Sequence, residues 1–278
     1  MRRWLATLAL LSAAVLAVAA PERIATYSPG ATRTLADFGA ADKIVAATRW
    51  CPLPATHPGA RDCDVFNPDL ERLLKAKPDL VILPRTSNPL WAERCRGADL
   101  KVLVLAPESA TCVLEDIRLI GEALGRSPEE IQRLNQPLER IPALLPRKLL
   151  IVWDGMMAGP DSYLGLPMRG AGFKSALKKG SWVKFDWETL AHVEPDVILW
   201  VESAPLDGPI VFSAKRKDEM SQVSLVKELK CLNAALIFET TSGSQWLPGS
   251  GLAQLVPKLA ELREKVRQTP EARNVQAR

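Results

Sequence analysis

The sequence contains few of the groups that mark metal centres and enzymes. Only two histidines occur in its 278 residues, His57 and His192. Sites for bare zinc or manganese ions combine several histidines with carboxylates, so we expect no such site. The G-x-S-x-G, H-E-x-x-H and glycine-rich phosphate-loop motifs are all absent. We therefore do not expect an enzyme, although an exported enzyme on a two-lobed α/β scaffold remains a more remote alternative.

Neither sign of charge is in large excess. The chain has 36 Lys and Arg against 32 Asp and Glu, a formal net charge of +4 at pH 7. This balance does not favour a nucleic acid as partner. The basic run Lys215-Arg216-Lys217 is followed at once by Asp218-Glu219, and we interpret it as a solvated loop.

Membrane-length apolar runs are absent beyond the N-terminal segment. Arg2 and Arg3 precede an apolar run over residues 5–18, and Ala17-Val18-Ala19 has the small-x-small pattern of a cleavage site. These features predict a cleaved secretory signal peptide over residues 1–19. An uncleaved anchor is the alternative, but the run is short for a membrane span. No cysteine stands directly after the cleavage site, where Ala20 follows Ala19, so a lipoprotein signal is not expected, and we predict a soluble periplasmic protein.

Cysteines are few but all lie after the predicted cleavage site. In an oxidising compartment such residues are by default expected to form disulfides. A Cys51–Cys63 bridge would close a proline-rich loop, and Cys95–Cys112 would be a second bridge, leaving Cys231 over. The sequence does not fix this pairing. The C-x-x-C spacing of structural zinc sites is absent, which makes a zinc site the weaker alternative.

The chain contains one segment twice. Residues 69–83 (DLERLLKAKPDLVIL) align without a gap to residues 186–200 (DWETLAHVEPDVILW), at an offset of 117 residues. Each copy predicts a short helix, a Pro-Asp break and a buried strand. A repeat at so long a period indicates two similar lobes rather than a solenoid. The identical pairs are Asp69/Asp186, Glu71/Glu188, Leu73/Leu190, Pro78/Pro195 and Asp79/Asp196.

Short apolar strands alternate with helices along most of the chain, which predicts an α/β fold with parallel, doubly wound sheets. We predict an N-terminal lobe over residues 20–110 and a C-terminal lobe over residues 148–268. Apolar residues at helical spacing predict a connecting helix over residues 111–147, interrupted at least once. The stretch 50–67 is predicted to be irregular, and residues 269–278 a disordered tail.

Several segments together resemble a known family. They are RIATYSPGATRTLADFGAADKIVAATRWC, FNPDLERLLKAKPDLVIL, GPDSYL, GAGF and WETLAHVEPDVIL. The chain resembles the periplasmic substrate-binding proteins of ABC importers for cobalamin, ferric siderophores and haem. The resemblance implies two α/β lobes joined by a long backbone helix, with a ligand cleft between the lobes. It also implies binding without catalysis and delivery of the ligand to a permease dimer in the inner membrane. We expect a monomer.

The resemblance also assigns a role to two repeated glutamates. In this family a Glu on each lobe docks into arginine-lined pockets of the permease, and the matching positions are Glu71 and Glu188. Two equivalent carboxylates on two lobes suit a two-fold symmetric partner. The alternative is an ordinary glutamate near a helix N-terminus, where the helix dipole favours it.

Candidate ligand contacts lie where strands end, because ligands of open α/β sheets bind at the carboxyl ends of the strands. Large flat rings would suit a large flat ligand, and seven tryptophans follow the predicted signal peptide. Trp153 and Trp200 end buried strands and are expected in the core. Phe66 is included because the family often places an aromatic residue there. The candidates are Ser28, Pro29, Trp50, Phe66, Arg85, Asp154, Tyr163, Trp182, Gln245 and Trp246.

The ligand class follows from the cationic residues near the strand ends. A ferric tricatecholate siderophore would need several cations, and only Arg85 and either Arg169 or Arg49 can be placed there. Haem binding through Tyr163 or a histidine is a second alternative. We therefore expect a corrinoid, with no resident cofactor or protein metal site. Gly251 stands where cobalamin binders of this family often have an arginine.

Overall fold

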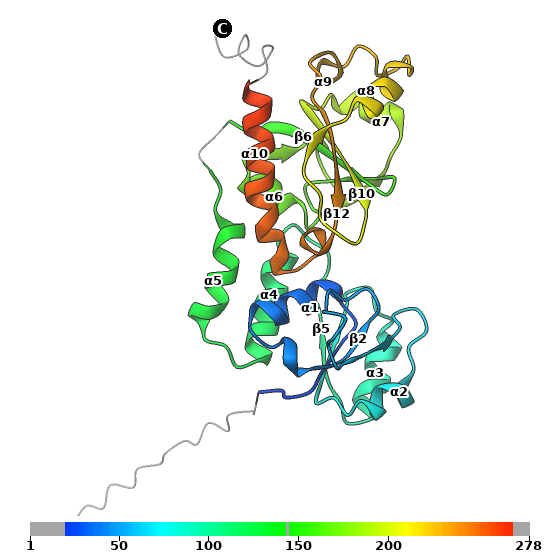
Figure 1. Ribbon diagram of the computed structural model, residues 1–278, viewed down its shortest axis with the longest axis vertical. Coiled ribbons are helices and arrows are strands. Elements are labelled where there is room, and N and C mark those ends of the chain that lie inside the picture. Colours follow the sequence, from blue (N-terminus) through cyan, green and yellow to red (C-terminus); the bar gives the residue numbers. More distant parts are fainter. Residues whose placement is uncertain (1–19, 143–144, 269–278) are drawn as a thin grey trace, which may run out of the picture.

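A computed structural model describes residues 20–142 and 145–268. The predicted signal peptide and the predicted C-terminal tail lie outside the described residues. The chain forms two α/β lobes stacked along its long axis, with helices α4, α5 and α10 along one side (Figure 1). The predicted two-lobed α/β fold is confirmed. Among the described helices, none combines the length and apolar character needed to cross a bilayer.

The N-terminal lobe is built on a fully parallel sheet of five strands in the order β3-β2-β1-β4-β5. Alternate residues of β1 face opposite sides: Ile24 packs into the main core and Ala25 into a smaller second core. Helices therefore cover both faces of the sheet. The elements are β1 (Ile24–Thr26), α1 (Pro29–Asp37), β2 (Ile44–Thr48), β3 (Ala60–Cys63), α2 (Leu70–Lys75), β4 (Leu80–Leu83), α3 (Pro89–Gly97) and β5 (Lys101–Val104).

Strand β3 corrects the prediction of an irregular stretch over residues 50–67. Its sequence, Ala-Arg-Asp-Cys, has no apolar alternation that would identify it. It lies at the edge of the sheet, paired with β2 alone. An edge strand needs fewer apolar residues than a central one, which explains why the sequence pattern missed it.

The C-terminal lobe has a mixed sheet rather than a purely parallel one. Its order is β11-β12-β10-β6-β7-β9, with β8 paired to β6. The long strands β6, β10 and β12 are parallel, whereas β7, β9 and β11 pair antiparallel at the two sides. The strands are β6 (Arg147–Trp153), β7 (Met156–Ala158), β8 (Phe173–Ser175), β9 (Trp182–Lys184), β10 (Val197–Ser203), β11 (Val211–Phe212) and β12 (Ile237–Ser242), and the helices are α6 (Gly165–Gly170), α7 (Trp187–Val193), α8 (Ala214–Ser221), α9 (Lys230–Asn233) and α10 (Leu255–Gln268).

The repeated segment forms the same local structure in both lobes. Asp69 and Asp186 cap helices α2 and α7 by accepting the N–H groups of Arg72 and Thr189. The two copies lie in separate sheets, because β4 belongs to the N-terminal sheet and β10 to the C-terminal sheet. The sequence repeat is therefore a structural repeat.

The Pro-Asp breaks of the repeat also perform the same task twice. The Asp79 carboxylate accepts the N–H groups of Glu22 (2.8 Å) and Arg23 (3.1 Å), and the Asp196 carboxylate accepts the N–H of Lys148 (2.7 Å). Each aspartate thus holds the residues that lead into or begin the neighbouring central strand. This contact fixes the start of β1 in one lobe and of β6 in the other.

The connection between the lobes consists of two helices instead of one long helix. They are α4 (Cys112–Ala123) and α5 (Pro128–Glu139). The break falls at Gly125, which has a positive φ of 69°, and Ser127 then starts α5 with a capping box to Glu130. Pro137 lies inside α5, which ends two residues later.

The two lobes share a continuous core. One cluster of buried apolar residues includes Ile82 of the N-terminal sheet and Leu150 and Leu199 of the C-terminal sheet. The segment 248–251 of the C-terminal lobe also packs on α1. Ser250 donates its N–H to Thr34 (3.1 Å) and its hydroxyl to Asp37 (2.6 Å). The lobes therefore meet in a firmly packed boundary.

The predicted disulfides are wrong: none of the five cysteines, all in the described part of the chain, forms a disulfide. Cys112 lies in the main core and Cys95 in the second core, on opposite faces of the N-terminal sheet. Cys51 is likewise buried in the main core, whereas Cys63 packs against the second. The sheet thus stands between Cys95 and Cys112.

The lobe boundary depends on a close approach of two main chains at Gly30 and Gly249. A Cβ atom at Gly30 would overlap the carbonyl group of Pro248, and one at Gly249 would overlap the carbonyl of Gly30. We expect Gly30→Ala to lower the free energy of unfolding by about 1–3 kcal/mol, because the two segments must separate. Chemical denaturation measures this change. Gly97→Ala is the control, since a Cβ there meets nothing within 4 Å; equal stability of the two variants would contradict the prediction.

Candidate functional site

The carboxyl ends of the long parallel strands in both sheets face the lobe boundary. In the N-terminal lobe, β1 ends just before Ser28 and α1, which packs on segment 248–251. Beyond β5, Glu108 accepts the N–H of Tyr163 from the C-terminal lobe at 3.1 Å. Ligands of open α/β sheets bind at such edges. The candidate site therefore lies where these two edges meet.

A pocket of about 200 Å³ opens beyond β2 and β3. Trp50 and Phe66, two of its lining residues, are 66% and 94% exposed. Two aromatic rings at this exposure leave a large apolar area in water that a ligand could cover. We call this hollow the N-lobe pocket; it is lined by Thr48, Arg49, Trp50, Arg61, Cys63, Asp64, Val65 and Phe66.

The two loops that carry these rings are fixed by polar contacts. Arg61 donates to the carbonyl oxygens of Leu53 (2.7 Å) and Pro54 (2.8 Å), which holds the loop after Trp50. Asp64 accepts the N–H of Phe66 at 2.8 Å and so forms the turn that displays the ring. These contacts therefore hold both rings in exposed positions.

Arg49 supplies the charge of the N-lobe pocket. Its guanidinium lies 4.9 Å from the centre of the Trp50 ring, within the range of a cation–π contact. No ion pair joins Arg49 to any carboxylate whose side chain the structure describes. Its positive charge is thus available to a ligand.

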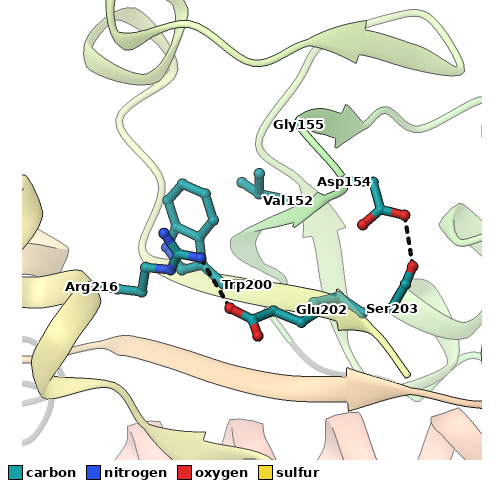
Figure 2. A pocket seen from close by; sticks show the side chains of 8 residues that line it. Val152, Asp154, Gly155, Trp200, Glu202, Ser203 and Arg216 are labelled. Atoms are coloured by element: carbon teal, nitrogen blue, oxygen red, sulfur yellow. Dashed lines mark hydrogen bonds and ion pairs between the residues drawn. The ribbon is translucent and has the colours of Figure 1, made fainter. Parts of the chain in front are cut away.

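A second pocket, of about 350 Å³, opens on the C-terminal lobe beyond β6 and β10 (Figure 2). Trp200 and Arg216 lie on one side of it and Asp154 on the other. The Arg216 guanidinium stacks 4.6 Å from the Trp200 ring centre and pairs with Glu202 at 3.1 Å. We call it the C-lobe pocket; its lining residues are Val152, Asp154, Gly155, Trp200, Val201, Glu202, Ser203 and Arg216.

Arg216 was predicted to lie in a solvated loop, and this prediction is wrong. It belongs to helix α8, which Ser213 caps by accepting the Arg216 N–H. Its side chain is 24% exposed and is held by Glu202, Glu219 and the Trp200 ring. The run of charged residues gave no sign of this contact, because the acidic partner Glu202 lies 14 residues earlier in the chain.

Several predicted contacts lie in one aromatic chain of the C-terminal lobe. The Tyr163 and Trp182 rings are 5.6 Å apart, Trp182 and Trp153 6.4 Å, and Trp153 and Trp246 6.1 Å. The chain connects to the C-lobe pocket, because Trp153 donates to Ser203 and Ser203 donates to Asp154. Tyr163, Trp182, Asp154 and Trp246 are thus brought together, although Trp246 is fully buried in this structure.

Arg85 lies at the end of β4 in a buried cluster of charges. It donates to Asp116 and lies 3.7 Å from Glu108, whose carboxylate also binds the Tyr163 N–H. Burial is the main influence on Asp116 and raises the pKa of its carboxyl to about 6, although Arg85 and the Ala106 N–H act in the opposite direction. Arg85 is therefore already paired, and its partner Glu108 makes the contact with the C-terminal lobe.

The remaining candidates occupy different positions. Ser28 is buried and caps α1, and Pro29 is the first residue of that helix. Gln245 is buried in the segment after β12. These three residues lie at the lobe boundary and outside both pockets. In the described residues, no three His, Cys, Asp or Glu side chains gather as a possible metal site.

The repeated glutamates lie on helices of different lobes. Glu71 in α2 is 79% exposed and pairs with Lys75 at 2.8 Å. Glu188 is exposed in the first turn of α7. Both helices lie on the side of the molecule away from α5 and α10 (Figure 1). The two carboxylates are therefore accessible at equivalent places in the two lobes.

A chain of two α/β lobes whose strand ends meet at the lobe boundary has the architecture of a two-lobed binding protein. The family model for periplasmic binding proteins matches residues 24–242. The chain therefore belongs to the periplasmic binding protein family.

The chain is similar to two related proteins and to one solved structure, among others. A cobalamin-binding protein of Halobacterium salinarum is 24% identical over 202 residues, which are 66% of this chain and 55% of that protein. An uncharacterized ABC transporter substrate-binding lipoprotein of Bacillus subtilis is 21% identical over 248 residues, 82% of this chain and 77% of that protein. The structure of the periplasmic haem-binding protein BhuT with two haems has a TM-score of 0.66 at 18% identity, covering 88% of this chain and 98% of that chain. The chain thus spans about half the length of the first of these relatives.

The buried Asp116 leads to a pH dependence of stability. Its folded-state pKa of about 6 lies above the ordinary value of 3.8, so the folded protein holds this proton more tightly than the unfolded chain. The resulting stabilisation is complete below about pH 4 and is lost as the pH rises through about 6. Relative to Asp116→Asn, we expect the wild type to lose about 3 kcal/mol of unfolding free energy over this range. Urea unfolding of both proteins across the range measures the difference, and a constant difference would contradict the prediction.

Proposed function

We propose that this protein captures a bulky metal chelate outside the cytoplasmic membrane and delivers it to an ABC permease. The preferred ligand is a corrinoid. The observation that carries the proposal is the pair of exposed aromatic rings, Trp50 and Phe66, on loops fixed at the carboxyl edge of the N-terminal sheet. Rings held in this way contribute contact area with little loss of side-chain entropy on binding.

The ligand class is supported by relatives and by the charges at the site. The Halobacterium salinarum relative is described as cobalamin-binding and the structural neighbour BhuT as haem-binding. Ferric siderophores and haem remain the alternative ligands. A corrinoid is favoured because Arg85, the cation expected to serve an anionic chelate, is already paired with Asp116 and Glu108.

A binding role without catalysis agrees with family membership. Closure of the lobes would be limited, because they share one continuous core and the contact of segment 248–251 with α1. The protein would therefore present a largely preformed site to its ligand.

The first test measures ligand binding by tryptophan fluorescence. Cyanocobalamin at micromolar concentration is expected to quench the wild-type emission. Trp50→Ala and Phe66→Ala should each weaken binding about 10- to 100-fold, since central aromatic contacts of an interface contribute most of its energy. Leu225→Ala is the control, because that apolar side chain is exposed and lies outside both pockets. Absence of quenching by cyanocobalamin, hemin and a panel of ferric siderophores alike would refute the proposed function.

The second test separates docking from ligand binding. The double variant Glu71→Ala, Glu188→Ala should impair uptake of the ligand in cells or proteoliposomes that contain the cognate permease. Its ligand affinity should remain that of the wild type, because both carboxylates are exposed and lie outside the pockets. Glu122→Ala provides a matched loss of an exposed, ion-paired helix glutamate. Normal uptake by the double variant would show that these residues have no docking role.

A further inference from the structure

The two pockets differ in the sign of their available charge. In the C-lobe pocket the charged groups are Asp154, Glu202 and Arg216. Arg216 is neutralised by Glu202 and by Glu219, at 3.1 and 2.9 Å, and its face is covered by Trp200. Among the lining residues one cation is therefore opposed by two carboxylates, and the C-lobe pocket is net negative.

The carboxylates of the C-lobe pocket also keep open acceptor positions. Asp154 receives one hydrogen bond through Oδ2, from Ser203 at 2.6 Å, and Glu202 receives one through Oε1, from Arg216. Among the described residues no donor reaches Asp154 Oδ1 or Glu202 Oε2. Ionised carboxylates accept several hydrogen bonds each. These oxygens suit a ligand that presents N–H groups, and they repel one that presents carboxylates.

The N-lobe pocket has the opposite character. Among the acidic side chains that the structure describes, only Asp64 lines this pocket. Its carboxylate already accepts the N–H groups of Phe66 and Asn67. Arg61 is occupied by main-chain carbonyl groups. Arg49 stacks on the exposed Trp50 ring and has no carboxylate partner among the side chains that the structure describes. The pocket thus offers one available cation next to two exposed rings.

The geometry points to a ligand selected by charge: a flat macrocycle that carries neutral N–H donors on the side facing the C-terminal lobe and one anionic group received by Arg49. This inference rests on the proposed function and narrows its ligand class. A cobalamin-type corrinoid fits, because it has peripheral amides and one phosphodiester. Hemin, with two carboxylates, and a ferric tricatecholate, with three negative charges, would place anions against Asp154 and Glu202.

The test uses isothermal titration of the purified protein with cyanocobalamin, dicyanocobinamide, which lacks the phosphodiester, and hemin. Arg49→Gln should weaken cyanocobalamin binding about tenfold, the value of one charge-assisted contact, and leave dicyanocobinamide unchanged. Arg94→Gln is the matched control, because Arg94 also stacks on a tryptophan, Trp91, but lies outside both pockets. Thermal unfolding checks that each variant is folded.

The second arm neutralises the C-lobe pocket. Asp154→Asn combined with Glu202→Gln should tighten hemin binding about tenfold and weaken cyanocobalamin binding, whereas Glu228→Gln, on the exposed surface, should change neither. Tighter binding of hemin than of cyanocobalamin by the wild type would overturn the inference while leaving the proposed function intact. So would variants that bind all three ligands as their controls do. If none of the chelates binds the wild type, the proposed function itself falls.

Discussion

The close approach of two main chains at Gly30 and Gly249 is the contact on which the arrangement of the lobes depends. It brings the start of α1 against the segment that follows β12, and Ser250 then binds both Thr34 and Asp37. Because α1 begins directly after β1, this contact also sets where the strand ends of one sheet stand relative to the other. The position of the two pockets relative to each other follows from it.

The fold could be predicted from the sequence where local patterns, such as the repeated segment, specify a helix or a strand. The repeat over residues 69–83 and 186–200 predicted two helix–strand units, and both are present in separate sheets. The sequence predicted an interruption of the connecting helix but not its position. The break between α4 and α5 falls at Gly125, whose positive φ is a property of the backbone that the apolar pattern does not show. The mixed sheet of the C-terminal lobe was missed, since β7, β9 and β11 have only two or three residues each.

The site was predictable where a residue follows a strand and lacks other partners. Trp50 was predicted because it follows a strand, whereas Phe66 was predicted because the family often places an aromatic residue there, and both line a pocket. Arg85 and Trp246 also follow strands, but their surroundings come from distant segments: Asp116 binds Arg85, and Trp153 packs on Trp246. Position along the chain does not reveal such contacts. The same limit explains why the stacking of Arg216 on Trp200 was missed.

The fluorescent tryptophan side chains of this protein differ in their exposure to solvent. Trp182, Trp153 and Trp246 lie within a few ångströms of one another and can exchange excitation energy, whereas Trp50 stands in solvent on the other lobe. The emission should therefore combine a short-wavelength part from buried tryptophans, which include Trp91 of the N-terminal lobe, with a long-wavelength part from Trp50. A coloured ligand bound beside Trp50 would quench the long-wavelength part of the emission most strongly.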